Sequence, residues 1–269
     1  MLSLAVRPCS AALAPFVKSL HYHESELPAG VERIMPNGQA HLMINLAEDQ
    51  FRSYHGAGCE RISAERGAVL AGPRGQSAAI DTREQMWLAA VQFRPGGAAA
   101  FFPLPLSETR DQMVDLGDLW GRDGGLIRER LLAAPTPAAK LRLLETILLE
   151  HLVMRGDPAV AFAIAALDRG MTVRDTAARA GFLPKTLVRR FEQQVGLAPK
   201  RFARVRRLQR ILKSARKGQE WPAIAAECGF ADQAHLIHDF RELTGITPSA
   251  YRPHSAQRGN HVPVSIGEG

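Results

Sequence analysis

The stretch AAECGFADQAHLIHDFRELTGITPSAYR, residues 225–252, repeats a pattern that the chain has already used. The earlier copy is AARAGFLPKTLVRRFEQQVGLAPKRFAR, residues 177–204. Gly181-Phe182 corresponds to Gly229-Phe230 at an offset of 48 residues, whereas later positions correspond at 49, so the second copy has gained one residue. Both copies end in Gly-x-x-Pro-x-x-aromatic. Two matches in register predict a duplicated structural unit.

Each copy has the pattern of a short helix, a tight turn and a longer helix. A pair of alanines lets the first helix approach the second closely, and a glycine permits the turn. The longer helix then carries a leucine and a phenylalanine four residues apart, Leu187 with Phe191 and Leu236 with Phe240. Because residues four apart share a helix face, we expect these side chains to be core. The sequence therefore predicts two helix-turn-helix units.

The opposite face of each longer helix is basic or polar. At about 100° per residue, Lys185 and Arg189 point away from the core in the first unit. The outward positions of the second unit are Ala234, His235, His238 and Arg241. Such a face suits the major groove of B-DNA, which admits a helix and offers acceptors at guanine O6 and N7. A merely solvated surface is the alternative, and each histidine could be a phosphate contact, a base contact or an exposed side chain.

Between the two units lies KRFARVRRLQRILKSARKG, residues 200–218. Its apolar residues recur at helical spacing, at Phe202, Val205, Leu208 and Leu212. This pattern predicts a stiff basic helix with one buried stripe. If the helix holds the two longer helices about 34 Å apart, one turn of DNA, both can enter successive major grooves. Two units in one chain would then read two half-elements without a palindrome.

Net charge supports a polyanionic partner. The chain of 269 residues has a formal charge of +7. Residues 171–252 contain 16 Lys and Arg against 7 Asp and Glu, which leaves the remainder at −2. Residues 185–217 hold 12 basic residues and one acid, Glu192. Each phosphate that such a segment neutralises releases condensed counterions and adds sequence-independent affinity, although a charge run is often only a solvated face.

The first hundred residues have a different sequence pattern, with short strand-like runs between turn residues. The runs are HLMINL at 41–46, AVLAG at 68–72 and MWLAAVQF at 86–93. This spacing predicts a small antiparallel barrel or sandwich. Two helices are expected after it, LIRERLLAA and TPAAKLRLLETILLEHLV, the second with Thr136 as its N-cap. The leucine stripe of that helix, Leu141, Leu144, Leu148 and Leu152, fits either the core or a dimer interface.

These patterns predict an α+β chain in which RGDPAV, residues 155–160, is a linker or short turn. The expected divisions are residues 1–155, a barrel with helices; residues 156–254, an all-α domain; and residues 255–269, a loosely ordered tail. No apolar run approaches the roughly 18 residues of a membrane span, and Arg7 with Pro8 interrupts any signal peptide. Three cysteines without CxxC spacing argue against disulfides and a zinc ribbon, so a reducing cytoplasm is expected.

On these residues, the chain from Met171 to Arg252 resembles the AraC/XylS family of bacterial transcription regulators, above all in the GF…F…TG…P…YR signature of the second copy. The resemblance implies a bipartite DNA-binding domain of seven helices, with regulation decided by contacts to RNA polymerase. The N-terminal half, with RIMPNGQAHLMINL and AGPRG, is similar to the sensor-type domain often fused to this module. That similarity implies a cupin-like barrel which, in relatives that respond to small molecules, binds an effector and mediates homodimerisation. No cofactor is expected.

The resemblance also assigns positions to the DNA. Its base-facing places are Lys185, Val188 and Arg189 in the first unit and Gln233, Ala234, His235 and His238 in the second. The basic residues expected to join them at the DNA are Arg190, Lys200, Arg201 and Arg241. Three positions depart from the family pattern: Leu183 replaces a Ser-like cap, Val188 offers no hydrogen bond, and His238 stands where Arg is common.

Three other functions fit parts of the sequence. A metal-dependent cupin-type enzyme could use His21, His23, Glu24, His41 and His55, but the glycine-flanked metal motif is absent. A DNA-repair methyltransferase would need an activated cysteine, and Cys228 sits inside the second unit, where a small buried thiol is expected. A non-specific architectural DNA binder would bind all sequences equally. We expect a regulator without enzymatic activity and without a bound metal.

Overall fold

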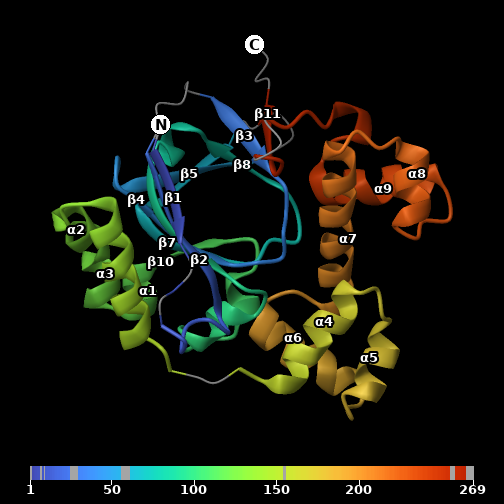
Figure 1. Cartoon of the computed structure of the whole chain (residues 1–269), viewed down its shortest axis with the longest axis horizontal. Coiled ribbons are helices and arrows are strands. Elements are labelled where there is room, and N and C mark those ends of the chain that lie inside the picture. The colour runs from blue at the N-terminus through green and yellow to red at the C-terminus, as the bar shows by residue number, and fades with distance from the viewer. Residues whose placement is uncertain are drawn as a thin grey trace.

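A barrel-like pair of antiparallel sheets forms the N-terminal part of the chain, and helices form the C-terminal part (Figure 1). The computed structural model describes residues 2–6, 8, 10–24, 30–55, 61–153, 156–254 and 258–264. Within these ranges the α+β architecture predicted from the sequence is confirmed. Residue 155, at which the first division was expected to end, lies outside the described residues.

The strands are arranged in two sheets in which every paired strand is antiparallel. The larger sheet contains, in spatial order, β1 (Leu2–Val6), β2 (Val17–Glu24), β9 (Trp87–Phe93), β4 (His41–Asn45), β7 (Ala68–Ala71) and β10 (Met113–Asp115). The smaller sheet contains β11 (His261–Val264), β3 (Val31–Ile34), β8 (Ala78–Asp81), β5 (Gln50–His55) and β6 (Arg61–Arg66). The three runs singled out in the sequence are β4, β7 and β9.

Three helices cover one face of the larger sheet (Figure 1). They are α1 (Leu116–Trp120), α2 (Arg122–Ala133) and α3 (Pro137–Glu150). Thr136 caps α3 as predicted, since its hydroxyl accepts a bond of 3.2 Å from the Ala139 amide. Leu141, Leu144 and Leu148 are buried in the core that α3 shares with the sheet. Of the two interpretations of this leucine stripe, the structure therefore supports the core.

The helical part is built around one long helix. Its elements are α4 (Pro158–Asp168), α5 (Val173–Arg179), α6 (Pro184–Val195), α7 (Pro199–Arg216), α8 (Trp221–Glu227), α9 (Gln233–Thr244) and the 3₁₀ helix η4 (Pro248–Ala250). Among the described residues, the seven helices implied by the resemblance are thus six α-helices and one 3₁₀ helix. The stripe predicted for α7 is confirmed: its first half packs with the first unit through Phe202 and its second half with the second unit through Leu208 and Leu212.

Part of the tail is ordered structure, so the expectation of a loosely ordered tail is wrong for residues 258–264. β11 pairs with β3 from His261↔Ile34 to Val264↔Val31. The Glu32 carboxylate lies in this region and accepts a hydrogen bond of 2.8 Å from His261 Nδ1. Pairing of this kind is non-local, because β3 and β11 are separated by almost the whole chain. A period-2 pattern of four residues gave too weak a local signal to predict it.

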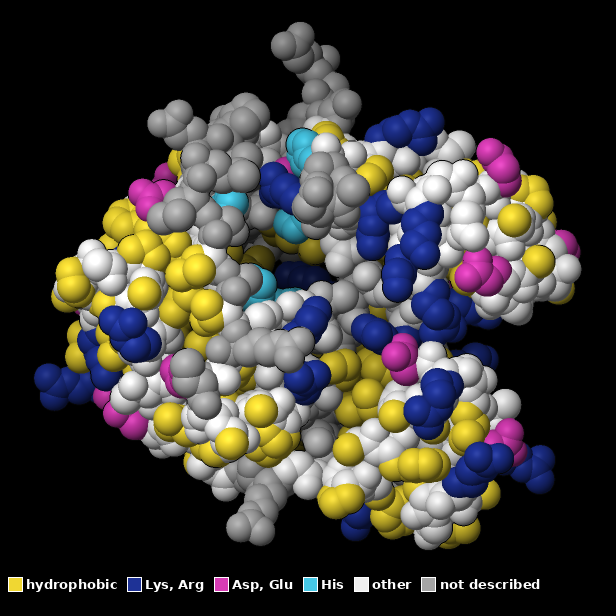
Figure 2. Space-filling view, in the orientation of Figure 1, with side chains coloured by type: hydrophobic (Ala, Val, Ile, Leu, Met, Phe, Trp, Pro, Cys, Tyr) yellow, Lys and Arg dark blue, Asp and Glu magenta, His cyan; other side chains and the backbone are white. Residues whose placement is uncertain are grey.

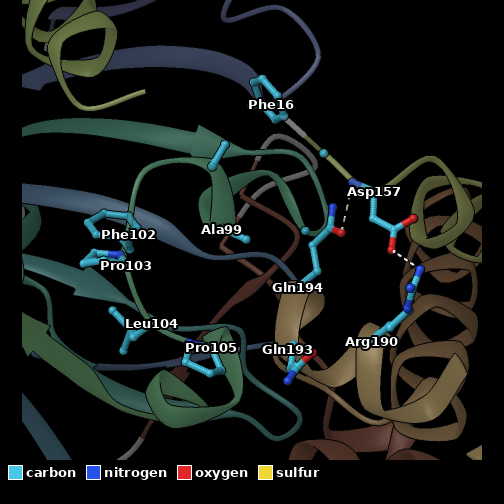
Figure 3. Close-up of a pocket in the computed structure, with 13 residues that line it drawn as sticks. Phe16, Ala99, Phe102, Pro103, Leu104, Pro105, Asp157, Arg190, Gln193 and Gln194 are labelled. Carbon is cyan, nitrogen blue, oxygen red and sulfur yellow. Dashed lines mark hydrogen bonds and ion pairs between the residues drawn. The ribbon is translucent and has the colours of Figure 1, made fainter. Parts of the chain in front are cut away.

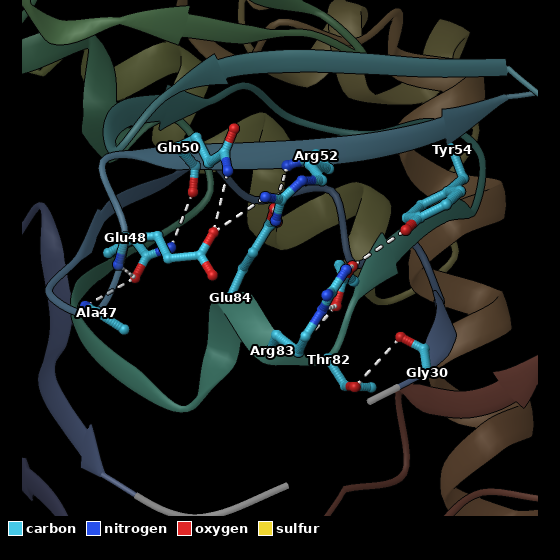
Figure 4. Close-up of polar contacts among 11 residues, drawn as sticks. Gly30, Ala47, Glu48, Gln50, Arg52, Tyr54, Thr82, Arg83 and Glu84 are labelled. Atoms are coloured by element: carbon cyan, nitrogen blue, oxygen red, sulfur yellow. Dashed lines mark hydrogen bonds and ion pairs between the residues drawn. The ribbon is translucent and has the colours of Figure 1, made fainter. Parts of the chain in front are cut away.

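At the far end of the smaller sheet, short 3₁₀ helix η1 (Arg83–Gln85) carries a network of charged residues (Figure 4). Arg83 binds Asp81 at 2.6 Å, and the Tyr54 hydroxyl donates to the same carboxylate at 3.0 Å. Arg52 binds Glu84 at 3.1 Å. The Tyr54 bond joins β5 to β8 and the Arg52 bond joins β5 to η1, so the carboxylates of Asp81 and Glu84 both have partners. None of the described helices combines the length and the apolar character that crossing a membrane requires.

Candidate nucleic-acid interface

The two longer helices of the repeat, α6 and α9, lie near opposite ends of α7 (Figure 1). Each ends at a glycine in the left-handed region, Gly196 with φ 83° and Gly245 with φ 74°. Their beginnings differ. The Asp232 carboxylate caps α9 by accepting a bond of 2.7 Å from the His235 amide, whereas Leu183 at the start of α6 makes no such bond. The sequence repeat is therefore a structural repeat with one weaker cap.

The outward face of α6 is cationic and open. Leu187 and Phe191 are fully buried, as expected for the core face. Lys185 and Arg189 are exposed and form no ion pair elsewhere in the described ranges. Val188 is half-buried between the two faces. An unpaired Lys and Arg on one exposed helix face can donate to phosphate or to the acceptors of guanine.

Arg190 has a different environment from its neighbour Arg189. Its guanidinium binds the Asp157 carboxylate at 3.1 Å and lies 4.7 Å from the centre of the Phe182 ring. Asp157 also caps α4, since its carboxylate accepts a bond from the Ala159 amide. Arg190 therefore joins α6 to α4, and DNA would have to compete with Asp157 for it.

The outward face of α9 is polar with little charge. The exposed residues on this helix include all five that the sequence placed at DNA: Gln233, Ala234, His235, His238 and Arg241. The His235 ring packs edge-on against Phe230, with centroids 5.1 Å apart. His238 and Gln233 make no side-chain hydrogen bond with any other residue that the structure describes. Both remain available to a partner.

Most arginines of α7 are engaged within the protein. Their acidic partners lie on neighbouring helices: Arg204 and Arg207 bind Asp239, Arg201 and Arg204 bind Glu242, and Arg206 and Arg210 bind Asp168. Arg201 also donates to the Gly75 carbonyl at 3.1 Å. The hydrogen bond from Arg204, with Arg201 nearby, lowers the pKa of Glu242 to about 2. These arginines fix α7 between the two units.

The acids of this network were not singled out in the sequence, although Asp239 and Glu242 are three residues apart and adjacent on α9. Lys200 and Lys213 on α7, and Lys217 directly after it, are exposed and form no ion pair with another described residue. Figure 2 shows Lys and Arg side chains gathered along α7 between the two helical lobes. The free positive charge of α7 is therefore carried chiefly by its lysines.

One loop of the barrel, residues 72–77 between β7 and β8, touches both units. A Cβ at Gly196 would lie 2.3 Å from Pro73 Cγ, so the end of α6 is closely packed against this loop. At the other end of the loop, the Ser77 amide donates to the Leu243 carbonyl at 2.9 Å. The Ser77 hydroxyl donates to the Thr244 carbonyl at 2.7 Å. The barrel thus contacts the carboxyl ends of both α6 and α9.

Two cavities lie where the barrel meets the helical part. The first, about 490 Å³, is lined by apolar residues of the barrel and by polar residues of α6 (Figure 3). Its labelled apolar side chains include Phe16, Phe102, Pro103, Leu104 and Pro105. The polar side of this cavity is formed by Asp157, Arg190, Gln193 and Gln194. Its charged groups are thus already paired with each other.

The second cavity, about 320 Å³, lies between the barrel and α7. It is lined by Lys18, Asn37, Gln39, Gln92, Arg94, Pro95, Arg206, Gln209 and Asn260. On β4 nearby, burial, together with the charges of His21 and Lys18, lowers the pKa of His41 to about 4.

The histidines proposed as metal ligands have other surroundings. His21 is hydrogen-bonded to the Ser19 hydroxyl at 2.7 Å, and the His55 side chain lies outside the described residues. Within the described ranges no three His, Cys, Asp or Glu side chains are grouped so that they could hold a metal ion. Cys228 is half-buried, and burial raises the pKa of its thiol. The other two cysteines lie outside the described residues.

Comparison with known proteins assigns the two parts separately. Residues 176–254 match a family described as a helix-turn-helix domain, and residues 5–115 match a domain of unknown function, DUF6597. Two proteins provisionally named AraC-like transcription regulators, from Streptomyces antibioticus and Streptomyces lividans, are 31% and 32% identical over 103 residues. These matches cover 36% of this chain and 34% of each relative, so the chain spans about a third of their length.

Two solved structures are also similar. The C-terminal domain of AraT, a response regulator from Geobacillus stearothermophilus, covers 37% of this chain and is itself covered to 87%, with 20% identity and a TM-score of 0.35. ToxT from Vibrio cholerae covers 93% of this chain and is covered to 97%, with 9% identity and a TM-score of 0.44. The sequence repeat, its two helix-turn-helix units and the family match lead to one conclusion. Residues 176–254 are a helix-turn-helix domain of the AraC type.

Proposed function

We propose that this protein is a sequence-specific DNA-binding transcription regulator that reads two successive major grooves with α6 and α9. The observation that carries the proposal is the pair of exposed outward faces on two repeated helices joined by α7. Lys185 and Arg189 would contact the first half-element, and Gln233, Ala234 and His238 the second. α7 has 18 residues, about 27 Å of helix, which is of the order of one turn of DNA.

The two faces differ in what they can recognise. Arg189 can bind guanine O6 and N7 bidentately, and Gln233 can bind adenine N6 and N7. Ala234 suits contact with a thymine methyl group. We therefore expect an asymmetric site rather than a palindrome. The lysines of α7 would add phosphate contacts that strengthen binding without specifying sequence.

Selection of bound fragments from a random DNA pool tests this function. The full chain should enrich one bipartite sequence, and that sequence should compete for binding far better than a scrambled version. Equal competition by scrambled DNA would support a non-specific architectural binder instead. Comparison of affinities at two salt concentrations is needed, because phosphate contacts alone give strong binding at low salt.

We also propose that the N-terminal domain controls this activity by binding a small-molecule effector in the cytoplasm, and that it has no enzymatic role of its own. Support comes from its two cavities, since both are shared with helices of the C-terminal part. The loop at residues 72–77 can transmit ligand binding in the barrel to the DNA-binding helices, because it contacts the carboxyl ends of both α6 and α9. Contacts with RNA polymerase, homodimerisation and the domain limits at residues 155 and 254 remain predictions.

A further inference from the structure

The cavity between the barrel and α7 combines residues from five separate segments. Lys18 lies on β2, and Gln92 and Arg94 lie at the end of β9. Asn37 and Gln39 come from the loop before β4. Arg206 and Gln209 belong to α7, and Asn260 precedes β11. A ligand in this cavity would therefore touch the barrel, the connecting helix and the tail at once.

Three positive charges border this cavity. Lys18 has no ion pair with another described residue. Arg94 uses its Nε to donate to the Ala14 carbonyl at 2.9 Å, which leaves both terminal nitrogens. Arg206 binds Asp168 through Nε at 2.7 Å and through Nη2 at 3.4 Å, which leaves Nη1. Each of the three cations therefore retains hydrogen-bond donors.

The carboxamides of the cavity leave further donors. Gln39, only 9% exposed, accepts from Gln92 through its oxygen at 3.0 Å, so its own amide nitrogen remains. Asn37 accepts from the Gln39 backbone amide at 2.9 Å, and Asn260 accepts from Gln209 at 3.2 Å. In both asparagines the side-chain nitrogen has no bond to any residue within the described part of the chain. These nitrogens are therefore further donors that a ligand in the cavity can use.

Few acceptors in the cavity are free, because the carboxamide oxygens of Asn37, Gln39, Gln92 and Asn260 already accept hydrogen bonds. None of its nine lining residues is acidic, and Pro95 alone lacks a polar side chain. The cavity is thus rich in donors, positively charged and hydrophilic. Such a site favours an oxyanion, because carboxylate and phosphate groups offer several acceptors and form charge-assisted bonds. The first cavity lacks this property, since it is mainly apolar and Arg190 there is already bound to Asp157.

We propose that the cavity between the barrel and α7 binds a small hydrophilic oxyanion, a carboxylate or phosphate metabolite, and that the bound anion holds the barrel against α7. The proposal that an anion binds rests only on the residues that line the cavity. Its regulatory consequence rests on the proposed function, because α7 carries both reading helices. By linkage, if the anion changes DNA affinity by some factor, DNA changes anion affinity by the same factor.

Isothermal titration of the full chain with inorganic phosphate, citrate and glucose 6-phosphate tests the binding. At least one of the three should bind with a dissociation constant below about 1 mM, and neutral glucose should not. The ligand that binds also distinguishes a carboxylate site from a phosphate site. The double variant Lys18→Gln/Arg94→Gln should weaken this binding about tenfold or more, because it removes two charged donors.

Two control variants separate this site from general attraction to a basic protein. Arg110→Gln/Arg122→Gln removes the same charge from exposed positions away from the cavity and should leave binding within about twofold. Lys185→Gln/Arg189→Gln removes charge from the face proposed for DNA and should also leave anion binding unchanged. Equal losses in all three variants would overturn the proposal, as would failure of all three anions to bind.

The effect of the anion on DNA binding is measured in a separate experiment. With the site selected from the random pool, DNA affinity is measured with and without the bound anion. A reciprocal change in both affinities supports the regulatory part, and no change contradicts it. If the protein binds no DNA at all, the proposed function fails, while the titration still decides whether the cavity binds an anion.

Discussion

The Ser77 hydroxyl, in the loop that follows β7, donates a hydrogen bond of 2.7 Å to the carbonyl of Thr244, the last residue of α9. The same loop packs Pro73 against Gly196 at the end of α6. One six-residue segment of the barrel, residues 72–77, therefore contacts the carboxyl ends of both proposed reading helices. Any movement of this loop would change the position of both helices relative to the barrel.

The contact at the end of α6 is tested by Gly196→Ala. The residue has φ 83°, where an L side chain is strained by roughly 1–2 kcal/mol, and its new Cβ would also meet Pro73. Gly181→Ala is the matched control, because Gly181 has φ 72° but no atom within 4 Å of the added Cβ. Thermal unfolding should show a larger loss of stability for Gly196→Ala. Equal losses would mean that the close contacts of Gly196 with Pro73 and with the Leu106 carbonyl contribute nothing.

Arg189 and Arg190 are adjacent in sequence but should differ in their effect on DNA binding. Arg189→Ala should cost about 1–3 kcal/mol and relax the preference at one base pair, if Arg189 reads guanine. Arg190→Ala should change base preference little, because Arg190 is bound to Asp157. Competition binding with all single-base variants of the selected site gives both answers. A uniform loss across all bases for Arg189→Ala would show a phosphate contact instead.

The ion pairs of α7 predict which cations contact phosphate. Lys200→Gln should lower the slope of log affinity against log salt by about 1, since Lys200 is exposed and unpaired among the described side chains. Arg207→Gln should leave that slope unchanged, because Arg207 binds Asp239 and lies 4.0 Å from the Phe230 ring centre. The free energy of unfolding of the Arg207→Gln variant is measured in parallel, because this substitution also breaks the partly buried ion pair with Asp239. A slope that falls equally in both variants contradicts the assignment.

Sequence reasoning succeeded where the signal was local. The repeat, the cores at Leu187 with Phe191 and at Leu236 with Phe240, and the cap at Thr136 all follow from spacing within a few residues. It failed where contacts join distant segments. A basic run cannot show that Asp239 and Glu242 neutralise its arginines, and no local pattern links residues 258–264 to β3. The shared cavities escaped it for the same reason.

Glu32 should make the attachment of the tail pH-dependent. Burial would raise the pKa of Glu32, but the hydrogen bond and charge of His261, with Arg258, hold it at about 2. A carboxyl with a lowered folded pKa contributes stability above its unfolded value of 4.5, and that contribution is lost as pH falls toward 2. Glu32→Gln should thus cost roughly 1.5–3 kcal/mol at pH 7 and progressively less between pH 4.5 and 2. A pH-independent difference in denaturant unfolding would contradict this.

Glu84 should show the opposite dependence. Burial raises its pKa to about 7, although Arg52 lies at 3.1 Å. A carboxyl with a raised folded pKa stabilises fully below its unfolded value of 4.5, and stability is lost as pH rises through 7. Glu84→Gln keeps an oxygen for the Arg52 amide and should raise stability at pH 8 relative to the unaltered chain. A loss of stability at pH 8 would show that the ion pair with Arg52 outweighs burial.

Recognition of a bipartite site requires α6 and α9 to occupy two grooves of one duplex at the same time. Hydroxyl-radical footprinting of the full chain on its selected site measures this directly. The expected pattern is two protected segments about 10 base pairs apart on one face of the DNA, with Arg189→Ala weakening one segment and His238→Ala the other. A single protected segment, altered alike by both variants, would contradict it.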